Sequence, residues 1–256
     1  MLGKLLKHEM IYLIKTFSPL YIVYLILAGV IRLLSLFENQ FEDLDTSSSG
    51  AITLIVFAGI IGVAYGILTG ILALLTMIDN VRRFKNNMFT DEGYLTNTLP
   101  VTATEHIAAK LLAGIINYLA SVVVILAGLF IASGEEAPSM AKGIWEAITS
   151  DSIPLSQKLI GLLLGFMIYV SIQLLGYLLS ALGNMVNSCK GLLSFGLGFF
   201  SVIFVMIMSA RITAFTTSQS LSGEQTILCI CAFLLVCCIC MYLLIVNIIK
   251  KHLNLQ

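Results

Sequence analysis

The sequence predicts an all-α polytopic membrane protein with six transmembrane helices, an N-terminal interfacial helix and a long cytoplasmic loop between the second and third transmembrane helices. Hydrophobic residues make up 59% of the chain and charged residues only 11%, against about 25% in a typical soluble domain. Six apolar runs of between 16 and 33 residues lie between consecutive charges, and about 20 apolar residues suffice for a membrane-spanning helix. This composition excludes a soluble enzyme, a disordered chain and a free nucleic-acid binder.

The predicted spans are continuous apolar segments, which favours helices over the alternating strands of a barrel. They belong to one transmembrane domain, residues 1–256, and cover residues 17–36, 52–77, 108–132, 159–182, 191–210 and 226–248. The first span is the weakest because Arg32 interrupts it. An arginine one turn from a helix end can extend its side chain to the membrane interface, so we retain this span.

Basic residues concentrate on one side of these spans, namely at Lys4, Lys7, Lys15, Arg82, Arg83, Lys85, Lys110, Lys190, Lys250 and Lys251. The other side carries fewer basic residues, namely Arg32, Lys142, Lys158 and Arg211. It also carries two acidic clusters, one at Glu38, Glu42, Asp43 and Asp45 and the other at Glu135 and Glu136. Lysine and arginine are enriched in cytoplasmic segments. Both termini are therefore predicted to be cytoplasmic.

Residues 1–16 have the pattern of a basic amphipathic helix. Their apolar residues share one face, at Leu2, Leu5, Leu6, Met10 and Leu13, and their basic residues cluster toward the other, at Lys4, Lys7, His8 and Lys15. Such a helix lies along the membrane surface, and we expect the chain to turn into the membrane at Pro19. A frayed, charged N-terminus that only sets the orientation is the alternative.

The longest predicted cytoplasmic segment, residues 78–106, contains both turn signals and apolar residues. The sequence Asp-Glu-Gly at residues 91–93 predicts a turn, and Thr102 with Glu105 fits a capping box that would start the third span near Ala103. Apolar and aromatic residues lie between these signals, at Met88, Phe89, Tyr94, Leu95, Leu99 and Val101. A loop of this composition is expected either to fold against the membrane or to dock on a partner protein.

Two cytoplasmic segments resemble the permease subunits of type-2 ATP-binding-cassette exporters from Gram-positive bacteria. The first is the opening MLGKLLKHE with Phe17 and the Pro-Leu-Tyr of 19–21, and the second runs from Arg83-Phe84 through DEGYL at 91–95 to TLPV at 98–101. The resemblance implies a permease subunit in the bacterial cytoplasmic (plasma) membrane. It also implies that the loop forms a coupling helix, which docks on a separate ATPase subunit through Phe89, Asp91, Glu92, Gly93, Tyr94, Leu95, Leu99 and Pro100.

The same resemblance implies a second permease subunit, identical or related, and membrane lipid as the surroundings. ATP and Mg are expected in the ATPase subunit, since this chain lacks the GxxxxGK[ST] loop that holds ATP phosphates. The cargo is expected to be amphipathic or lipophilic, such as a peptide, a lipid or a drug. The alternative function is a passive, channel-like or immunity membrane protein that acts without ATP.

No catalytic or metal site is predicted. The Leu-Ser-Gly-Glu-Gln segment at 221–225 resembles the signature motif of cassette ATPases, but a turn with Ser222 capping the sixth span explains it better. Five of the six cysteines lie in the sixth span, where cysteine is expected to pack as a small hydrophobe, at Cys229, Cys231, Cys237, Cys238 and Cys240. The three histidines are scattered along the chain.

Small and polar residues within the spans are candidates for a translocation path or a helix interface. Gly62, Gly66 and Gly70 repeat every four residues, a spacing that lets helix backbones approach closely, either within the subunit or between two subunits. Asn117 and Gln173 either line a path for cargo or form interhelical hydrogen bonds. The spans contain no carboxylate of the kind that ion-coupled carriers use, which favours a transporter driven from outside the bilayer.

Overall fold

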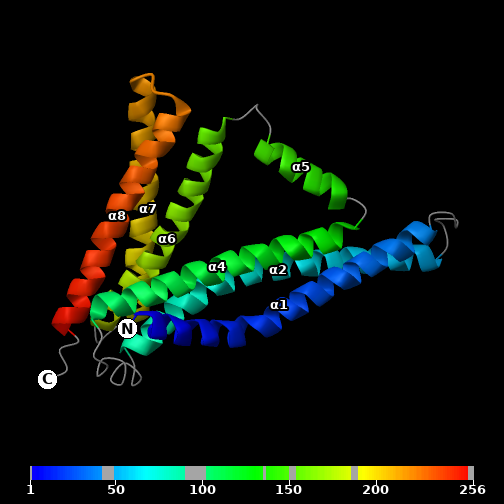
Figure 1. Ribbon diagram of the computed structural model, residues 1–256, viewed down its shortest axis with the longest axis horizontal. Helices are drawn as coiled ribbons and strands as arrows, with labels where there is room; N and C mark the ends of the chain where they lie inside the picture. Colours follow the sequence, from blue (N-terminus) through cyan, green and yellow to red (C-terminus); the bar gives the residue numbers. More distant parts are fainter. Residues whose placement is uncertain are drawn as a thin grey trace. The chain divides into compact units, whose positions relative to one another are not determined.

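The computed structural model describes residues 2–41, 49–89, 102–134, 137–149, 154–185 and 190–252. Within these ranges the chain forms seven helices and no strand (Figure 1): α1 (Leu2–Phe41), α2 (Ser49–Phe89), α4 (Ala103–Ser133), α5 (Ala137–Thr149), α6 (Leu155–Met185), α7 (Lys190–Ser218) and α8 (Gly223–His252). All of them except α5 are long and apolar enough to cross a membrane. The predicted all-α fold is confirmed, and the six apolar helices indicate a multi-pass membrane protein.

Each predicted span lies inside one of these six helices, and the helices extend beyond the spans. The largest difference is in α1, which runs without a break through Pro19. The predicted interfacial helix and the first span therefore form one helix. Proline removes a backbone hydrogen bond and bends a helix without necessarily ending it, and Figure 1 shows α1 bending in its N-terminal part. The placement of residues 1–16 along the membrane surface stays a prediction.

Large apolar side chains are exposed along the candidate spans. On α7, Phe195 is 78% exposed and Phe200 is 70% exposed. Contiguous apolar surface of this kind is rare on soluble monomers and marks contact with lipid or with another subunit. The exposed face of α7 is thus consistent with the membrane character of the chain.

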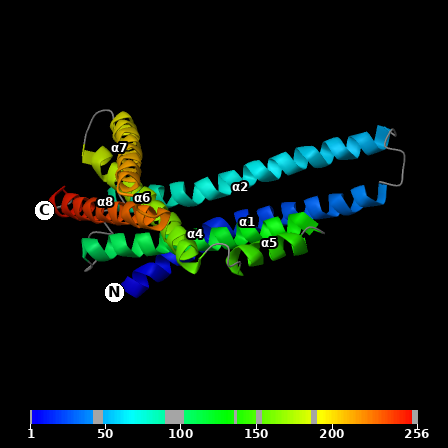
Figure 2. The same ribbon diagram turned by 90° about the horizontal axis from the view of Figure 1, so that it is seen from above.

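Two compact units divide the chain. Unit 1 comprises Met1–Leu5, Asp79–Leu112 and Ser150–Gln256, and unit 2 comprises Leu6–Ile78 and Ala113–Thr149. In unit 1, α6, α7 and α8 contact one another and lie side by side (Figures 1 and 2). The last part of α2 and the first part of α4 belong to the same unit. The loop that joins α2 to α4 is therefore flanked on both sides by residues of unit 1.

The capping box predicted before α4 is confirmed, and the N-cap predicted at Ser222 before α8 is part of a second capping box. Before α4, the backbone nitrogen of Thr102 donates to Glu105 Oε2 at 3.1 Å, and the Glu105 nitrogen donates to Thr102 Oγ1 at 3.4 Å. Before α8, the Ser222 nitrogen donates to Gln225 Oε1 at 3.0 Å, and the Gln225 nitrogen donates to Ser222 Oγ at 3.4 Å. These bonds satisfy backbone donors that the first helical turn leaves without partners.

The end of α4 is marked by a glycine. Gly134 has φ +56°, a left-handed conformation that glycine adopts without strain and that commonly follows a helix C-terminus. A Cβ at this position would collide with the side chain of Arg32, so the guanidinium lies directly against the helix end. Positive charge is favourable there because helix C-termini carry partial negative charge. After this stop the chain forms α5, which is not among the predicted elements.

Candidate functional site

The predicted coupling residues lie mostly outside the described residues. Phe89, the last residue of α2, is described, whereas Asp91, Glu92, Gly93, Tyr94, Leu95, Leu99 and Pro100 are not. The segments on either side of this loop are described in full. The site can therefore be built from the two helix ends that carry the loop, both of which belong to unit 1.

A series of side-chain contacts connects Phe89, at the end of α2, to Gln173 of α6. Phe89 meets the ring of Phe84 edge-on, with centroids 5.9 Å apart, and Phe84 stacks on Tyr177 with centroids 4.2 Å apart. Gln173 Nε2 then donates to the Tyr177 hydroxyl at 3.0 Å. Phe84 and Tyr177 are fully buried. Two of the predicted site residues, Phe89 and Gln173, are thus joined through Phe84 and Tyr177, which were not predicted as site residues.

The end of α2 also approaches the backbone of α6 closely. A Cβ placed on Gly176 would collide with Cγ2 of Val81 and lie 3.2 Å from its Cγ1. Real Cβ atoms do not approach other heavy atoms so closely, so any larger residue at Gly176 would displace Val81. The glycine therefore allows the contact between the two helices, as small residues do at membrane helix interfaces.

The start of α4 is attached to the same core. Ile107 is fully buried in one cluster with Met88 of α2 and with Ile245 and Ile249 of α8. In addition, the Tyr242 hydroxyl of α8 donates to the carbonyl oxygen of Thr104 at 3.4 Å. Both ends of the loop are consequently packed against the α6–α8 body of unit 1.

A buried lysine links the two flanks to each other. Lys110 of α4 is buried, and its Nζ donates to the Asn87 amide oxygen of α2 at 3.1 Å when that amide is oriented with its oxygen toward the lysine. In the same orientation the Asn87 amide nitrogen donates to the Arg83 carbonyl oxygen at 3.2 Å. Hydrogen bonds to a charged group are stronger than neutral ones, especially away from water. This contact ties the last turns of α2 to the first turns of α4.

Gln173 lies in the core of unit 1 and is 1% exposed. Its Oε1 has no hydrogen-bond partner within the described part of the chain, although its Nε2 is paired with Tyr177. Leaving a buried acceptor unpaired costs roughly 1–3 kcal/mol. Of the two predicted roles for Gln173, its position in the packed core agrees better with a helix interface than with a path for cargo.

Asn117 makes an interhelical hydrogen bond in unit 2. The Tyr21 hydroxyl of α1 donates to Asn117 Oδ1 of α4 at 3.3 Å and lies 2.6 Å from Ser121 Oγ. One turn further along α1, Tyr24 stacks on Tyr65 of α2, with ring centroids 4.8 Å apart. Such contacts supply polar attraction between helices in an apolar surrounding. The geometry agrees with the helix-interface interpretation of Asn117.

The glycine repeat of α2 packs against nothing that the structure describes. A Cβ placed on Gly62, Gly66 or Gly70 would meet no atom within 4 Å. The close approach that this spacing permits is therefore not realised with another described helix of the same chain. Contact of this stripe with a second subunit stays a prediction.

Unit 1 contains an apolar cavity that the sequence did not predict and that is open to the outside, since lining residues such as Phe200 are exposed. It measures about 570 Å³ and lies between α6, α7 and α8. Its lining is almost entirely apolar, with residues such as Ile172, Phe200, Phe204, Met206 and Leu244. The hydroxyls of Ser171 and Ser201 face backbone carbonyls of their own helices at 2.7 Å. None of the described residues that line this cavity is charged, and its size falls within the range of roughly 300–1,000 Å³ typical of ligand pockets.

The cysteines of α8 are free thiols with different surroundings. Cys231 and Cys238 are buried, and Cys229 and Cys240 are exposed. Cys238 Sγ lies 3.2 Å from Ser171 Oγ of α6, so it takes part in helix packing. Among the residues that the structure describes, no group of three or more His, Cys, Asp or Glu side chains could hold a metal ion.

The anchored flanks could not be identified from the sequence alone, because contacts between α2 and α6 involve residues almost one hundred positions apart. The local spacing that identified Phe89 contains no sign of Tyr177 or of Gly176. Comparison of the chain with protein-family models, with curated proteins and with solved structures finds no match.

Proposed function

We propose that this chain is the membrane-spanning, non-catalytic permease subunit of an ATP-driven exporter in the bacterial plasma membrane. A separate cassette ATPase binds ATP and Mg and docks on the loop between α2 and α4. Two permease subunits, identical or related, together form the translocation path. Both termini of the chain lie in the cytoplasm.

The observation that carries this proposal is the attachment of both loop flanks to one packed body. A loop that transmits force must be held at its ends, because a mobile attachment would absorb the displacement. Here the α2 flank is held by the Phe84–Tyr177 stack and by the Val81–Gly176 contact. The α4 flank is held by Ile107 and by the bond from Tyr242. A displacement of the loop is thus passed to α6 and α8.

The cavity of unit 1 supports an amphipathic or lipophilic cargo. The described residues of its lining offer apolar surface and no charge, so it favours an acyl chain or an apolar side chain over a sugar or an ion. Burying apolar groups contributes about 0.8 kcal/mol per CH₂. Peptides with apolar side chains, lipids and hydrophobic drugs all present such groups.

The first experiment is purification of the tagged chain in mild detergent from its host, followed by mass spectrometry of copurifying proteins. A stoichiometric partner that contains a GxxxxGK[ST] loop is the expected result. A folded sample that never contains an ATPase, even after crosslinking from a Tyr94→Cys variant, would contradict the proposal and favour a passive membrane protein.

The second experiment tests the loop itself. The double variant Tyr94→Ala with Leu95→Ala removes two apolar side chains that are expected to bury on the ATPase. We expect transport-coupled ATP hydrolysis to be lost while the helical content stays unchanged. Thr96→Ala with Asn97→Ala is the matched control in the same loop and should retain activity. Unchanged coupled hydrolysis in the Tyr94 and Leu95 variant would refute the assignment of the coupling site.

A further inference from the structure

Helix α5 differs from every other helix of the described chain in length and in surroundings. It has 13 residues, and so it is about 20 Å long, too short for a hydrocarbon core of about 30 Å. Both of its neighbours along the chain, α4 and α6, are candidate membrane spans. Six residue steps, at most about 20 Å of extended chain, connect the end of α5 to the start of α6. These short connections keep α5 close to a membrane surface.

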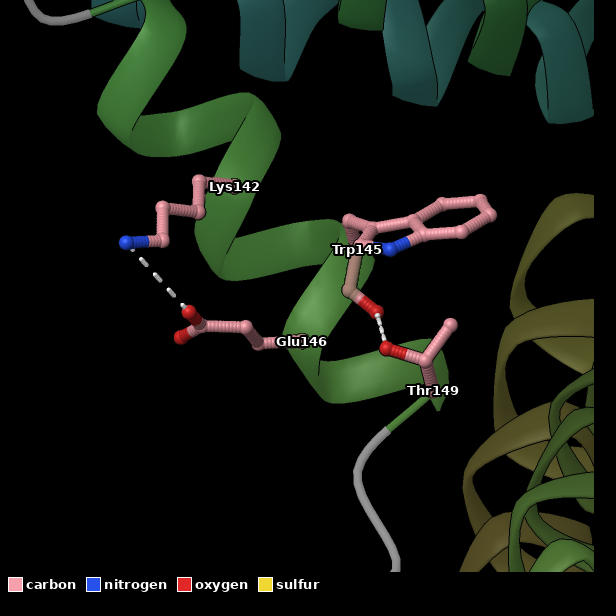
Figure 3. Close-up of polar contacts among 4 residues, drawn as sticks. All are labelled: Lys142, Trp145, Glu146 and Thr149. Carbon is pink, nitrogen blue, oxygen red and sulfur yellow. Dashed lines mark hydrogen bonds and ion pairs between the residues drawn. The ribbon is translucent and has the colours of Figure 1, made fainter.

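One side of α5 is polar and exposed. Lys142 and Glu146 are one turn apart, and Lys142 Nζ lies 3.8 Å from Glu146 Oε1. Their side chains are 77% and 63% exposed, and both point to the same side of the helix (Figure 3). An ion pair this exposed contributes little stability. Its importance here is that it identifies the side of α5 that stays in water.

The other side of α5 is apolar. Met140 lies on the side opposite Lys142, since two residues correspond to about 200° of rotation in a helix. The sequence repeats isoleucine four and eight residues after Met140. Trp145 lies at the border between the two sides, is 66% exposed, and points away from both charged side chains (Figure 3). Tryptophan is enriched at the membrane–water interface because its ring is apolar and its N–H is polar.

We propose that α5 is a membrane-surface helix, bound to the bilayer through Met140 and the apolar side, with Trp145 at headgroup depth and Lys142 and Glu146 in water. The occupant of this surface is the lipid bilayer itself. Helices of this kind bury their apolar side about 5–10 Å into the boundary between headgroups and acyl chains. This inference does not depend on the exporter proposal, because it concerns only α5 and the two helices that flank it.

The test uses the intrinsic fluorescence of Trp145, the only tryptophan of the chain. The purified full-length chain is reconstituted into phosphatidylcholine vesicles that carry bromine either near the headgroups or deep in the acyl chains. We expect emission at shorter wavelength than for tryptophan in water, and stronger quenching by the shallow bromines than by the deep ones. Soluble iodide should quench only weakly.

Two adjacent substitutions provide a matched comparison. Met140→Asp places a charge on the apolar side and should shift the Trp145 emission to longer wavelength and reduce bromine quenching. Ser139→Asp places the same charge one residue away on the polar side and should leave both unchanged. Strong iodide quenching of the unmodified protein would place Trp145 in water and overturn the proposal. Short-wavelength emission without bromine quenching would show that protein covers α5, and would overturn it equally.

Discussion

Gly176 occupies the contact between the last turns of α2 and the α6 backbone, where a Cβ would collide with Val81. Glycine to alanine in a helix interior ordinarily stabilises by roughly 0.5–1 kcal/mol. For Gly176→Ala we expect the opposite, a destabilisation of roughly 1–3 kcal/mol, because inserting a methyl group into a packed contact forces neighbours apart. Thermal unfolding in detergent would measure the change.

A double variant tests whether the contact with Val81, and not another effect of alanine, causes the loss of stability in Gly176→Ala. The Cβ that Gly176→Ala introduces would meet Cγ1 and Cγ2 of Val81. Val81→Ala removes both of these methyl groups, so the double variant should recover much of the lost stability. Gly161→Ala serves as the control, since a Cβ at Gly161 meets no atom within 4 Å. Equal effects of Gly176→Ala with and without Val81→Ala would contradict the contact.

Single residues show which features of the site could be recognised from sequence. Phe89 and Gln173 were predicted because an aromatic residue in a polar loop and an amide in an apolar run are unusual in their surroundings. Phe84 and Tyr177, which connect them, were not recognised as a pair. Their contact depends on the crossing of two helices, and local spacing carries no information about such a crossing.

At the scale of the helices, the two capping boxes make a local prediction. Thr102→Ala removes the hydroxyl that accepts the Glu105 backbone hydrogen bond before α4. Loss of an N-cap costs about 0.5–2 kcal/mol. Hydrogen exchange in the first turn of α4 should therefore accelerate, by roughly five-fold for a cost near 1 kcal/mol, as measured by mass spectrometry of proteolytic peptides.

The cap before α8 provides the reciprocal control. Ser222→Ala should accelerate exchange at the start of α8 and leave the start of α4 unchanged, because each capping box spans only four residues. Acceleration spread over both helices in either variant would indicate global destabilisation, and would contradict a local role for the caps.

Helix positions were predictable from sequence to the extent that local chemistry determines them. The starts of α4 and α8 follow from the capping box at Thr102 and the N-cap at Ser222, and each predicted span lies inside a helix. The continuity of α1 through Pro19 was not predicted, because proline ends some helices and only bends others. The short helix α5 was missed since its mixed composition fails the length and hydropathy criteria of a span.

For the molecule as a whole, the charge distribution predicts an orientation that chemical labelling can test. In a background without native cysteines, Gln219→Cys in the turn between α7 and α8 should react with an impermeant maleimide in intact cells. Lys251→Cys should react only after the membrane is permeabilised. Both positions are exposed, so a difference in labelling reports the side of the membrane and not burial.

The same labelling experiment has a built-in negative control and a clear contrary result. A variant that retains only Cys238, which is buried against α6, should react in neither condition. Protection of Gln219→Cys together with labelling of Lys251→Cys in intact cells would show that the orientation is the reverse of the predicted one. The loop between α2 and α4 would then lie on the side opposite to any cytoplasmic ATPase.

The division of the chain into units has a consequence for biosynthesis. Every residue of unit 2 has been made once Thr149 leaves the ribosome, whereas the core of unit 1 requires Ile245 and Ile249 near the end of the chain. At about 5–20 residues per second, translation of the last hundred residues takes roughly 5–20 s. During that interval the flanks of the loop between α2 and α4 lack the helices against which they pack. If the proposed exporter assignment holds, the docking surface for the ATPase is completed last, and unfinished chains bind the ATPase poorly.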